Sequence, residues 1–228
     1  MNVIGASEKM RKYIAQMGQH IWWTKTNFSL IIFVFCQKSK NAIEIVFNTG
    51  ELLDKADYLE WSRKYDKSFG WEAQREHELG AKFRKVKVLT CAQLAQVVEW
   101  KFNANPEKKT RALELVARND EAMVARVSGQ VFSLPQSGDS YRMNCLTALE
   151  GISPVLASVI LAFFDPHQYG IFDISVWKPL LGNPPPNLYI TQNYIRLLAA
   201  LRKTAAKHNL DARTIDKALY KKSIDASS

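Results

Sequence analysis

The stretch Leu146–Trp177, with the sequence LTALEGISPVLASVILAFFDPHQYGIFDISVW, decides the fold. A helical run turns sharply at Gly151-Ile152-Ser153, and a second apolar helix is predicted over Pro154–Phe164, ended by Asp165-Pro166. Two helices joined by so tight a turn form a helical hairpin, whose turn leaves backbone N–H groups pointing outward. Such N–H groups can hold a phosphate oxygen without help from a side chain.

Asp173 is the candidate catalytic residue. It follows the apolar pair Ile171-Phe172 and precedes another helical segment, so we expect its carboxylate at the mouth of a packed cavity. Helix capping is the alternative role, because Asp before Ile-Ser-Val-Trp is also a good N-cap. A phosphate-holding turn and a recessed carboxylate on one rigid unit would suit chemistry on nucleic acid.

These residues resemble the helix-hairpin-helix and catalytic-aspartate core of base-excision DNA glycosylases, the superfamily that contains endonuclease III and the alkylpurine glycosylases. Leu149, Gly151, Ile152 and Ala157 match the family pattern. Asp173 stands where that pattern has its aspartate, 22 positions after Gly151. The resemblance is specific over Leu146–Trp177 and implies that Asp173 stabilises an oxocarbenium-like sugar or orients the attacking water.

Two positions depart from the family pattern. Ser153 replaces the second hairpin glycine but still offers a backbone N–H, and Val155 stands where bifunctional members carry their Schiff-base lysine. The resemblance therefore implies a monofunctional glycosylase, or a binder with the same fold. It also implies that the turn Leu149–Ser153, made by Leu149, Gly151, Ile152 and Ser153, clamps the DNA backbone, with room for a monovalent cation shared between carbonyls and phosphate; no other cofactor is expected.

The charge supports a polyanionic partner. The formal net charge is +9 over 228 residues, which favours nucleic acid or a membrane surface over an acidic small molecule. A basic soluble protein without such a partner is the alternative. Two groups of basic residues could contact phosphates: Lys82, Arg84, Lys85, Lys87, Lys101, Lys108, Lys109 and Arg111, and then Arg202, Lys203, Lys207, Arg213, Lys217, Lys221 and Lys222.

The three cysteines and the apolar segments bear on location. Cys36, Cys91 and Cys145 are far apart and form no metal-binding spacing, which predicts no metal and a reduced, cytoplasmic or nucleoid-associated setting. The apolar run 29–36 is much shorter than the roughly 20 residues that span a bilayer, so no membrane is expected. The charged N-terminus does not resemble a signal peptide. Nothing points to an obligate protein partner.

The chain is predicted to be mostly α, a compact helical array. Helices are expected to begin near residues 49, 71, 90, 105, 120, 140, 189 and 211, each at a capping residue or an apolar pattern with helical spacing. Residues 48–228 would form the glycosylase-like domain, with two lobes and a cleft as in the family. Residues 1–47 would be an N-terminal addition, either a short β-hairpin with its turn at 38–41 or an extension packed on the core.

A glycosylase also needs a pocket for the flipped base. Trp100, Lys101, Tyr141, Tyr169 and Trp177 are the candidates to line it, although core packing is the usual fate of any single aromatic residue. Glu99 and Gln130 are candidates to read the edge of the base.

The predicted function is a monofunctional DNA glycosylase that flips a damaged or modified base and hydrolyses its glycosidic bond. Both housekeeping repair and defence against foreign DNA with modified bases fit this activity. The first alternative is a non-catalytic DNA-binding module in which Asp173 is only a helix cap. A protein-interaction module that inherited the fold is the second.

Overall fold

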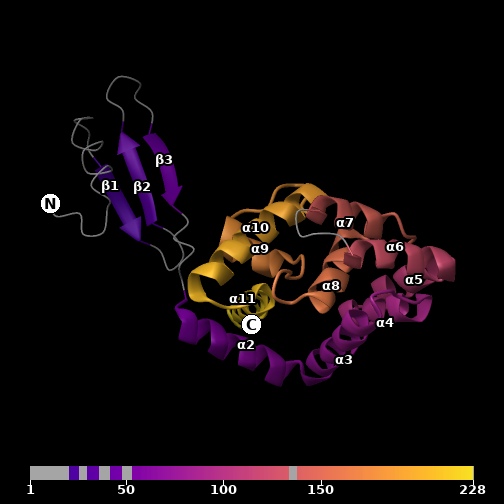
Figure 1. Cartoon of the computed structure of the whole chain (residues 1–228). Helices are drawn as coiled ribbons and strands as arrows, with labels where there is room; N and C mark the ends of the chain where they lie inside the picture. Colours follow the sequence, from indigo (N-terminus) through magenta and orange to yellow (C-terminus); the bar gives the residue numbers. More distant parts are fainter. Residues whose placement is uncertain (1–20, 26–29, 36–41, 48–52, 134–137, 228) are drawn as a thin grey trace. The chain divides into compact units, whose positions relative to one another are not determined.

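The computed structural model describes residues 21–25, 30–35, 42–47, 53–133 and 138–227 of the chain (Figure 1). The chain divides into two units, residues 1–52 and residues 53–228, so the division falls slightly beyond the expected boundary at residue 47. The mostly helical fold class is confirmed.

The described part of the first unit is a three-stranded antiparallel sheet of strand order β1-β2-β3. Its strands are β1 (Ile21–Lys25), β2 (Leu30–Phe35) and β3 (Ala42–Phe47). In the register, Ile21 pairs with Val34, and Phe35 pairs with Ala42. The extended segments thus fall where β-branched and aromatic residues cluster, whereas the turn expected at 38–41 lies outside the described residues.

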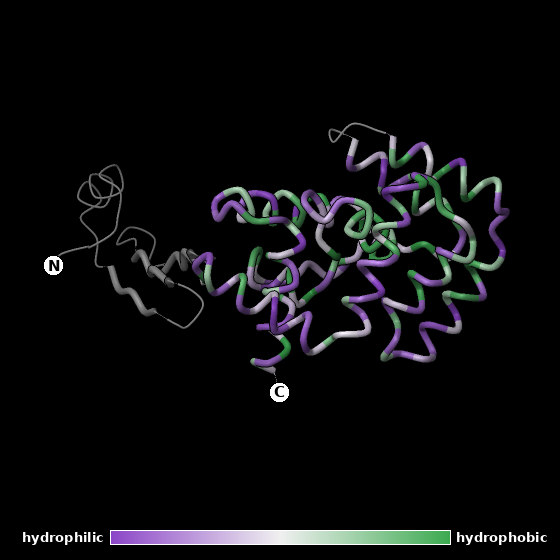
Figure 2. Tube along the Cα trace, turned by 60° about the horizontal axis from the view of Figure 1, so that its bottom comes forward, coloured by the Kyte–Doolittle hydropathy of each residue, from purple (hydrophilic) through white to green (hydrophobic). Residues whose placement is uncertain are grey.

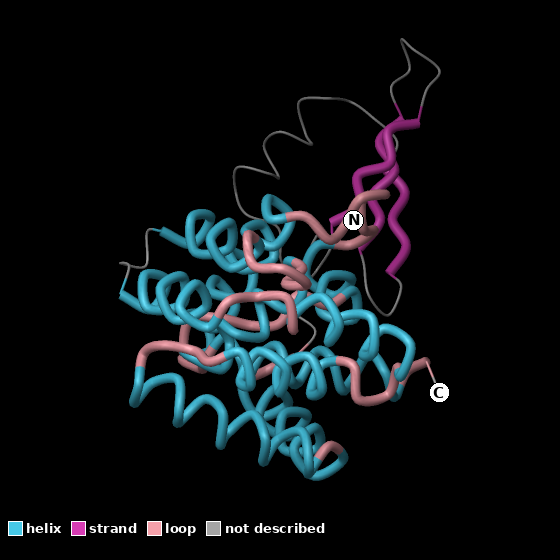
Figure 3. The backbone as a smooth tube through the Cα atoms, turned by 90° about the vertical axis from the view of Figure 1, so that its right-hand side faces the viewer, coloured by secondary structure: helices cyan, strands magenta, loops and turns pink. Residues whose placement is uncertain are grey.

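The described part of the second unit is built from ten helices, joined by short loops (Figure 3). They are α2 (Lys55–Ser68), α3 (Gly70–Val86), α4 (Cys91–Lys101), α5 (Pro106–Val116), α6 (Glu121–Ser133), α7 (Asp139–Thr147), α8 (Pro154–Phe164), α9 (Ile174–Leu181), α10 (Thr191–His208) and α11 (Ala212–Asp225).

Local capping sets where several of these helices begin. Thr90 and Gln93 form a reciprocal capping box at α4, and the Asn105 side chain caps α5 with Pro106 in its first turn. Both starts agree with the sequence prediction. The first helix instead begins after Asp54, because the Asp54 and Asp57 side chains each accept a hydrogen bond from the other residue's backbone N–H. The expected cap Thr49 lies outside the described residues.

Helix α8 is the centre of the helical unit. Every residue from Leu156 to Phe163 is buried, as expected for a helix that is apolar all round. It packs against α3, α4, α7 and α10, and hydrophobic residues are concentrated towards the interior of this unit (Figure 2). Gly80 of α3 allows a close approach of α3 to α8, since a Cβ at that position would lie 2.6 Å from the carbonyl oxygen of Phe163.

The first and last helices of this unit lie side by side. Helix α2 packs extensively along α11, and α11 also contacts α9 and α10 (Figure 1). Segments more than a hundred residues apart in sequence therefore form one wall, and the candidate site opens beside it.

Candidate active site

The turn between α7 and α8 is held by the Asn119 side chain and by hydrogen bonds within the turn itself. Asn119 clasps it, with its side-chain nitrogen donating to the Glu150 carbonyl and its side-chain oxygen accepting from the Glu150 N–H, both at 2.9 Å. Ile152 N–H donates to the Leu149 carbonyl at 3.2 Å, and the Ser153 hydroxyl accepts from Leu156 N–H at 3.3 Å, which caps α8. The side chains of Leu149 and Ile152 are buried, so only their backbone could meet a ligand.

Gly151 is required at this turn. Its φ is +76°, in the left-handed region that glycine tolerates best. A Cβ there would lie 2.8 Å from the Leu115 Cβ and 2.9 Å from the Val116 nitrogen of α5. Among the described residues, nothing accepts a hydrogen bond from the N–H groups of Gly151 and Ser153. The turn therefore offers two backbone donors to a ligand.

The loop from α8 to α9 is tightly fixed. Phe172 N–H donates to the buried Ser158 hydroxyl at 2.8 Å, and Ile171 N–H donates to the Asp216 carboxylate at 2.9 Å. The Tyr194 hydroxyl donates to the Gly170 carbonyl at 3.0 Å. These three bonds come from three different helices, so they set the position at which the loop delivers Asp173.

Asp173 caps α9 and forms an ion pair at the same time. One carboxylate oxygen accepts from Ser175 N–H at 3.0 Å, and the other lies 3.0 Å from Lys101 Nζ. Lys101 is at the end of α4, and both side chains are mostly but not fully buried, with 17% and 19% exposure. We call Lys101 and Asp173 the mouth pair.

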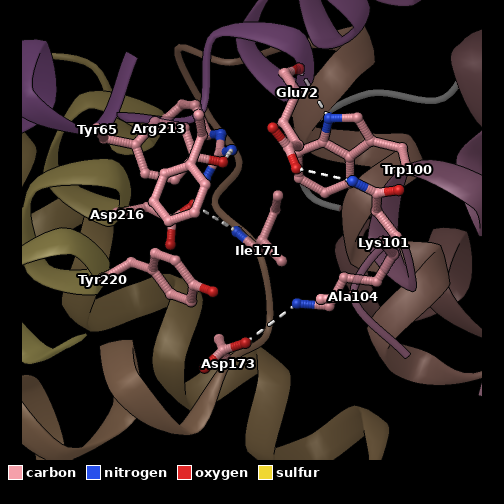
Figure 4. Close-up of a pocket in the computed structure, with 12 residues that line it drawn as sticks. Tyr65, Glu72, Trp100, Lys101, Ala104, Ile171, Asp173, Arg213, Asp216 and Tyr220 are labelled. Atoms are coloured by element: carbon pink, nitrogen blue, oxygen red, sulfur yellow. Dashed lines mark hydrogen bonds and ion pairs between the residues drawn. The ribbon is translucent and has the colours of Figure 1, made fainter. Parts of the chain in front are cut away.

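The mouth pair borders a cavity of about 120 Å³ (Figure 4). Its wall combines aromatic rings with charged groups drawn from α2, α3, α4, α11 and the loop before α9. The aromatic members are Tyr65, Phe69, Trp100 and Tyr220, and the charged members are Glu72, Lys101, Asp173, Arg213 and Asp216. Ile171 lies between Tyr65 and Tyr220 on one side and Trp100 and Lys101 on the other (Figure 4). The expectation that Asp173 lies beside a hollow is thus met by the geometry.

A buried cluster of charged side chains joins Arg213 and Asp216 of the cavity wall to Glu76, which does not line the cavity. Arg213 donates to both oxygens of Glu76, at 2.9 and 2.8 Å, and is paired with Asp216. Burial acts to raise the pKa of Glu76, but the charges and hydrogen bonds of Arg213 and Lys217 outweigh it and hold that pKa below its usual range. For Asp216, burial prevails and raises the pKa despite Arg213.

Tyr220 provides a protonated hydroxyl beside the mouth pair. Its burial, together with the negative charges of Asp173 and Asp216, raises the pKa of this phenol. Its hydroxyl points towards the mouth pair in Figure 4. It can therefore donate a hydrogen bond to a ligand at neutral pH.

Of the five aromatic and basic pocket candidates, Trp100 and Lys101 line this cavity and three do not. Tyr169 is fully buried and its hydroxyl is held by Asp139 and Arg142 at 2.6 and 2.7 Å. Trp177 is buried in the core, and Tyr141 lies half-exposed on α7.

The two residues expected to read the edge of a base, Glu99 and Gln130, do not line the cavity either. Gln130 instead donates to the Tyr141 hydroxyl at 2.9 Å. Besides Asp173 and Asp216, the cavity is lined by the carboxylate residue Glu72, which the sequence analysis missed.

The missed wall residues Tyr65, Phe69 and Tyr220 come from the two ends of the helical unit. The spacing of Tyr65 and Phe69 places both rings on one side of α2, a signal visible in the sequence. The packing of α2 against α11 brings Tyr220 to them, with ring centroids 5.9 Å from Tyr65 and 6.1 Å from Phe69. No local pattern predicts that pairing.

Some basic residues are unavailable for phosphate contact. Arg213 is buried and forms ion pairs with Glu76 and Asp216, so its predicted role as a phosphate contact is wrong. Arg202 is paired with Asp139, and Lys217 with Asp66. In contrast, Lys108 and Arg111 are exposed on α5, the helix that packs beneath the Gly151 turn.

The described residues contain no group of three or more His, Cys, Asp or Glu side chains arranged to hold a metal ion. At the turn, the carbonyl oxygens of Leu149 and Glu150 already accept hydrogen bonds. Within the same described residues, no helix is both long and apolar enough to cross a bilayer.

Comparisons of the chain with protein-family models, with curated proteins and with solved structures found no match.

Proposed function

We propose that this protein is a monofunctional DNA glycosylase that flips a modified base out of DNA and hydrolyses its glycosidic bond. One observation carries the proposal: the Asp173 carboxylate lies at the mouth of a cavity lined by aromatic side chains. Breaking an N-glycosidic bond develops positive charge on the sugar, and a carboxylate in a partly dry site stabilises that charge or activates water. Aromatic faces are what a flipped base stacks on.

The mouth pair fits this chemistry if bound DNA separates Lys101 from the Asp173 carboxylate. In the free protein, Lys101 holds one Asp173 oxygen, while the Ser175 N–H holds the other. A DNA phosphate near the cavity would attract the Lys101 ammonium and release a carboxylate oxygen towards the sugar. The Ser175 N–H would continue to orient the carboxylate.

The α7–α8 turn supplies an anchor for the DNA backbone in this proposal. The unpartnered N–H groups of Gly151 and Ser153 would donate hydrogen bonds to a phosphate oxygen, as helix-hairpin-helix turns do in the resembling family. Exposed Lys108 and Arg111 on the adjoining helix would add salt-sensitive contacts.

The decisive experiment is base release from DNA that carries a panel of modified bases, with abasic sites as the readout. Asp173→Asn should lower release by roughly 10²–10⁴-fold, the usual contribution of a general acid or base. It should barely change stability, because Asn caps helices about as well as Asp. Asp54→Asn is the matched control, since Asp54 caps α2 and is not among the residues that line the cavity.

Three outcomes separate the parts of this proposal. Full release by folded Asp173→Asn protein would refute the catalytic role. Strand cleavage, or a covalent complex trapped by borohydride, would contradict the monofunctional assignment that rests on Val155. Release of the base that leaves uncut abasic DNA, and that is lost in Asp173→Asn but not in Asp54→Asn, would support the proposal in full.

A non-catalytic DNA-binding module is the second candidate. It is favoured by the ion pair itself, because Lys101 neutralises Asp173 and the cap occupies its second oxygen. This alternative expects salt-dependent DNA binding, with no abasic product from any member of the panel.

A further inference from the structure

Two carboxylates lie at opposite ends of the cavity. Figure 4 shows Asp173 at one end and Glu72 at the other, beside Trp100, with Ile171 between the two carboxylates. If Asp173 acts on the sugar, as in the proposed function on which this inference rests, the glycosidic bond lies at its end. The far edge of the base then faces Glu72.

Glu72 is fixed by two contacts. Its backbone carbonyl accepts from Trp100 Nε1 at 2.8 Å, and its side-chain Oε1 accepts from Asn103 Nδ2 at 3.1 Å. Among the described residues, no donor reaches its second carboxylate oxygen or the Asn103 side-chain oxygen. Both remaining positions are hydrogen-bond acceptors, so this end of the cavity favours a ligand that donates a hydrogen bond.

The size of the cavity limits the ligand to a small ring. Its volume of about 120 Å³ is close to the roughly 150 Å³ cavity that accommodates benzene. A single six-membered ring therefore fits better than a purine. The rings of Tyr65 and Tyr220 on one side and Trp100 on the other offer surfaces for stacking.

We propose that the cavity selects a pyrimidine with an exocyclic amino group at C4, the cytosine type, over its 4-keto counterpart. In such a base the amino group lies opposite the glycosidic nitrogen and donates hydrogen bonds, whereas uracil and thymine present an acceptor there. Glu72 would accept from the amino group. The keto oxygen would face two acceptors and lose its hydrogen bond with water.

A binding experiment tests this independently of base release. The protein is Asp173→Asn, and the probes are oligonucleotides with cytosine or uracil, and 5-methylcytosine or thymine, at one position. That position is paired with an abasic analogue in the other strand, so that every base costs a similar amount to flip. Fluorescence anisotropy at fixed salt gives the dissociation constants.

We expect the amino base of each pair to bind about tenfold more tightly, the discrimination typical of one good polar base contact. Adding Glu72→Gln should abolish or reverse the preference, because the amide places a donor opposite the keto oxygen. Adding Glu78→Gln should leave it unchanged, since Glu78 is on the same helix and bonds to Gln74 and Arg75 instead.

Equal affinity for amino and keto bases, or a preference that survives Glu72→Gln, overturns the assignment. Failure of the proposed function shows elsewhere, as absence of base release by the wild-type protein. A Glu72-dependent preference without release would leave the cavity as a base-binding site in a non-catalytic module. Release without any Glu72 dependence would keep the enzyme and remove this specificity.

Discussion

Two groups of opposite charges lie at the same cavity and differ in how far they are exposed to water. The buried cluster of Glu76, Arg213 and Asp216 is almost inaccessible, with side-chain exposures of 9%, 6% and 1%. The mouth pair of Lys101 and Asp173 is joined by one ion pair and is more accessible. A charge that is removed from water needs several fixed partners, whereas a charge at the mouth can exchange its partner for a ligand. The comparison assigns the first group to the fold and the second to function.

The largest expected effect tests the structural side of this comparison. Arg213→Met should lower the free energy of unfolding by about 3–5 kcal/mol, because it leaves two buried carboxylates without their cation. Urea denaturation followed by circular dichroism measures it. Arg63→Met, at an exposed position on α2, is the control and should change stability by less than about 0.5 kcal/mol. A loss below about 1 kcal/mol for Arg213→Met would mean that the cluster does not hold the fold.

A pH series sharpens the same assignment. Because the pKa of Glu76 is lowered in the folded protein, its contribution is present above its unfolded pKa of about 4.3 and is lost as the pH falls through the folded value. Asp216 has the opposite sign, since its raised pKa makes protonation favour the folded state. Glu76→Gln should therefore flatten the acid loss of unfolding free energy, and Asp216→Asn should steepen it. Equal slopes in both variants and wild type between pH 6 and 3, by urea denaturation, would contradict this.

The smallest stability effect is expected at the mouth. Lys101→Met should change the free energy of unfolding by only about 0–1 kcal/mol, since a partly exposed ion pair contributes little. The same substitution should weaken DNA binding and reduce its salt dependence by about one counterion. Lys55→Met, at an exposed position on α2 outside both groups of candidate phosphate contacts, is the control for charge alone. A loss comparable with that of Arg213→Met would place the mouth pair among the structural groups and break the comparison.

The sequence was sufficient for the parts of the site that depend on local physics. The apolar run of α8, the caps at Thr90 and Asn105, and the position of Asp173 at the start of a helix follow from periodicity and capping. Mostly helical architecture was predictable for the same reason. The pocket wall was not, because it depends on which amphipathic faces meet.

The failure at the wall has a specific cause. Tyr169 and Trp177 are close to Asp173 in sequence, but both side chains are buried in the core, where Tyr169 meets Asp139 and Arg142. Tyr65 and Tyr220 lie far from Asp173 in sequence and reach the cavity only because α2 packs on α11. Amphipathic spacing predicts which face of a helix is buried, but it does not predict which other helix covers that face.

The absent side chain at Gly80 sets how near α3 stands to α8. Any larger residue would meet the Phe163 carbonyl and act as a wedge between the two helices. Since α3 carries Glu72 and the chain beyond α8 carries Asp173, we expect such a wedge to increase the distance between the two carboxylates. A contact outside the cavity thus helps to set the size of the cavity, and we expect a larger residue at position 80 to give a protein that accepts a larger ligand.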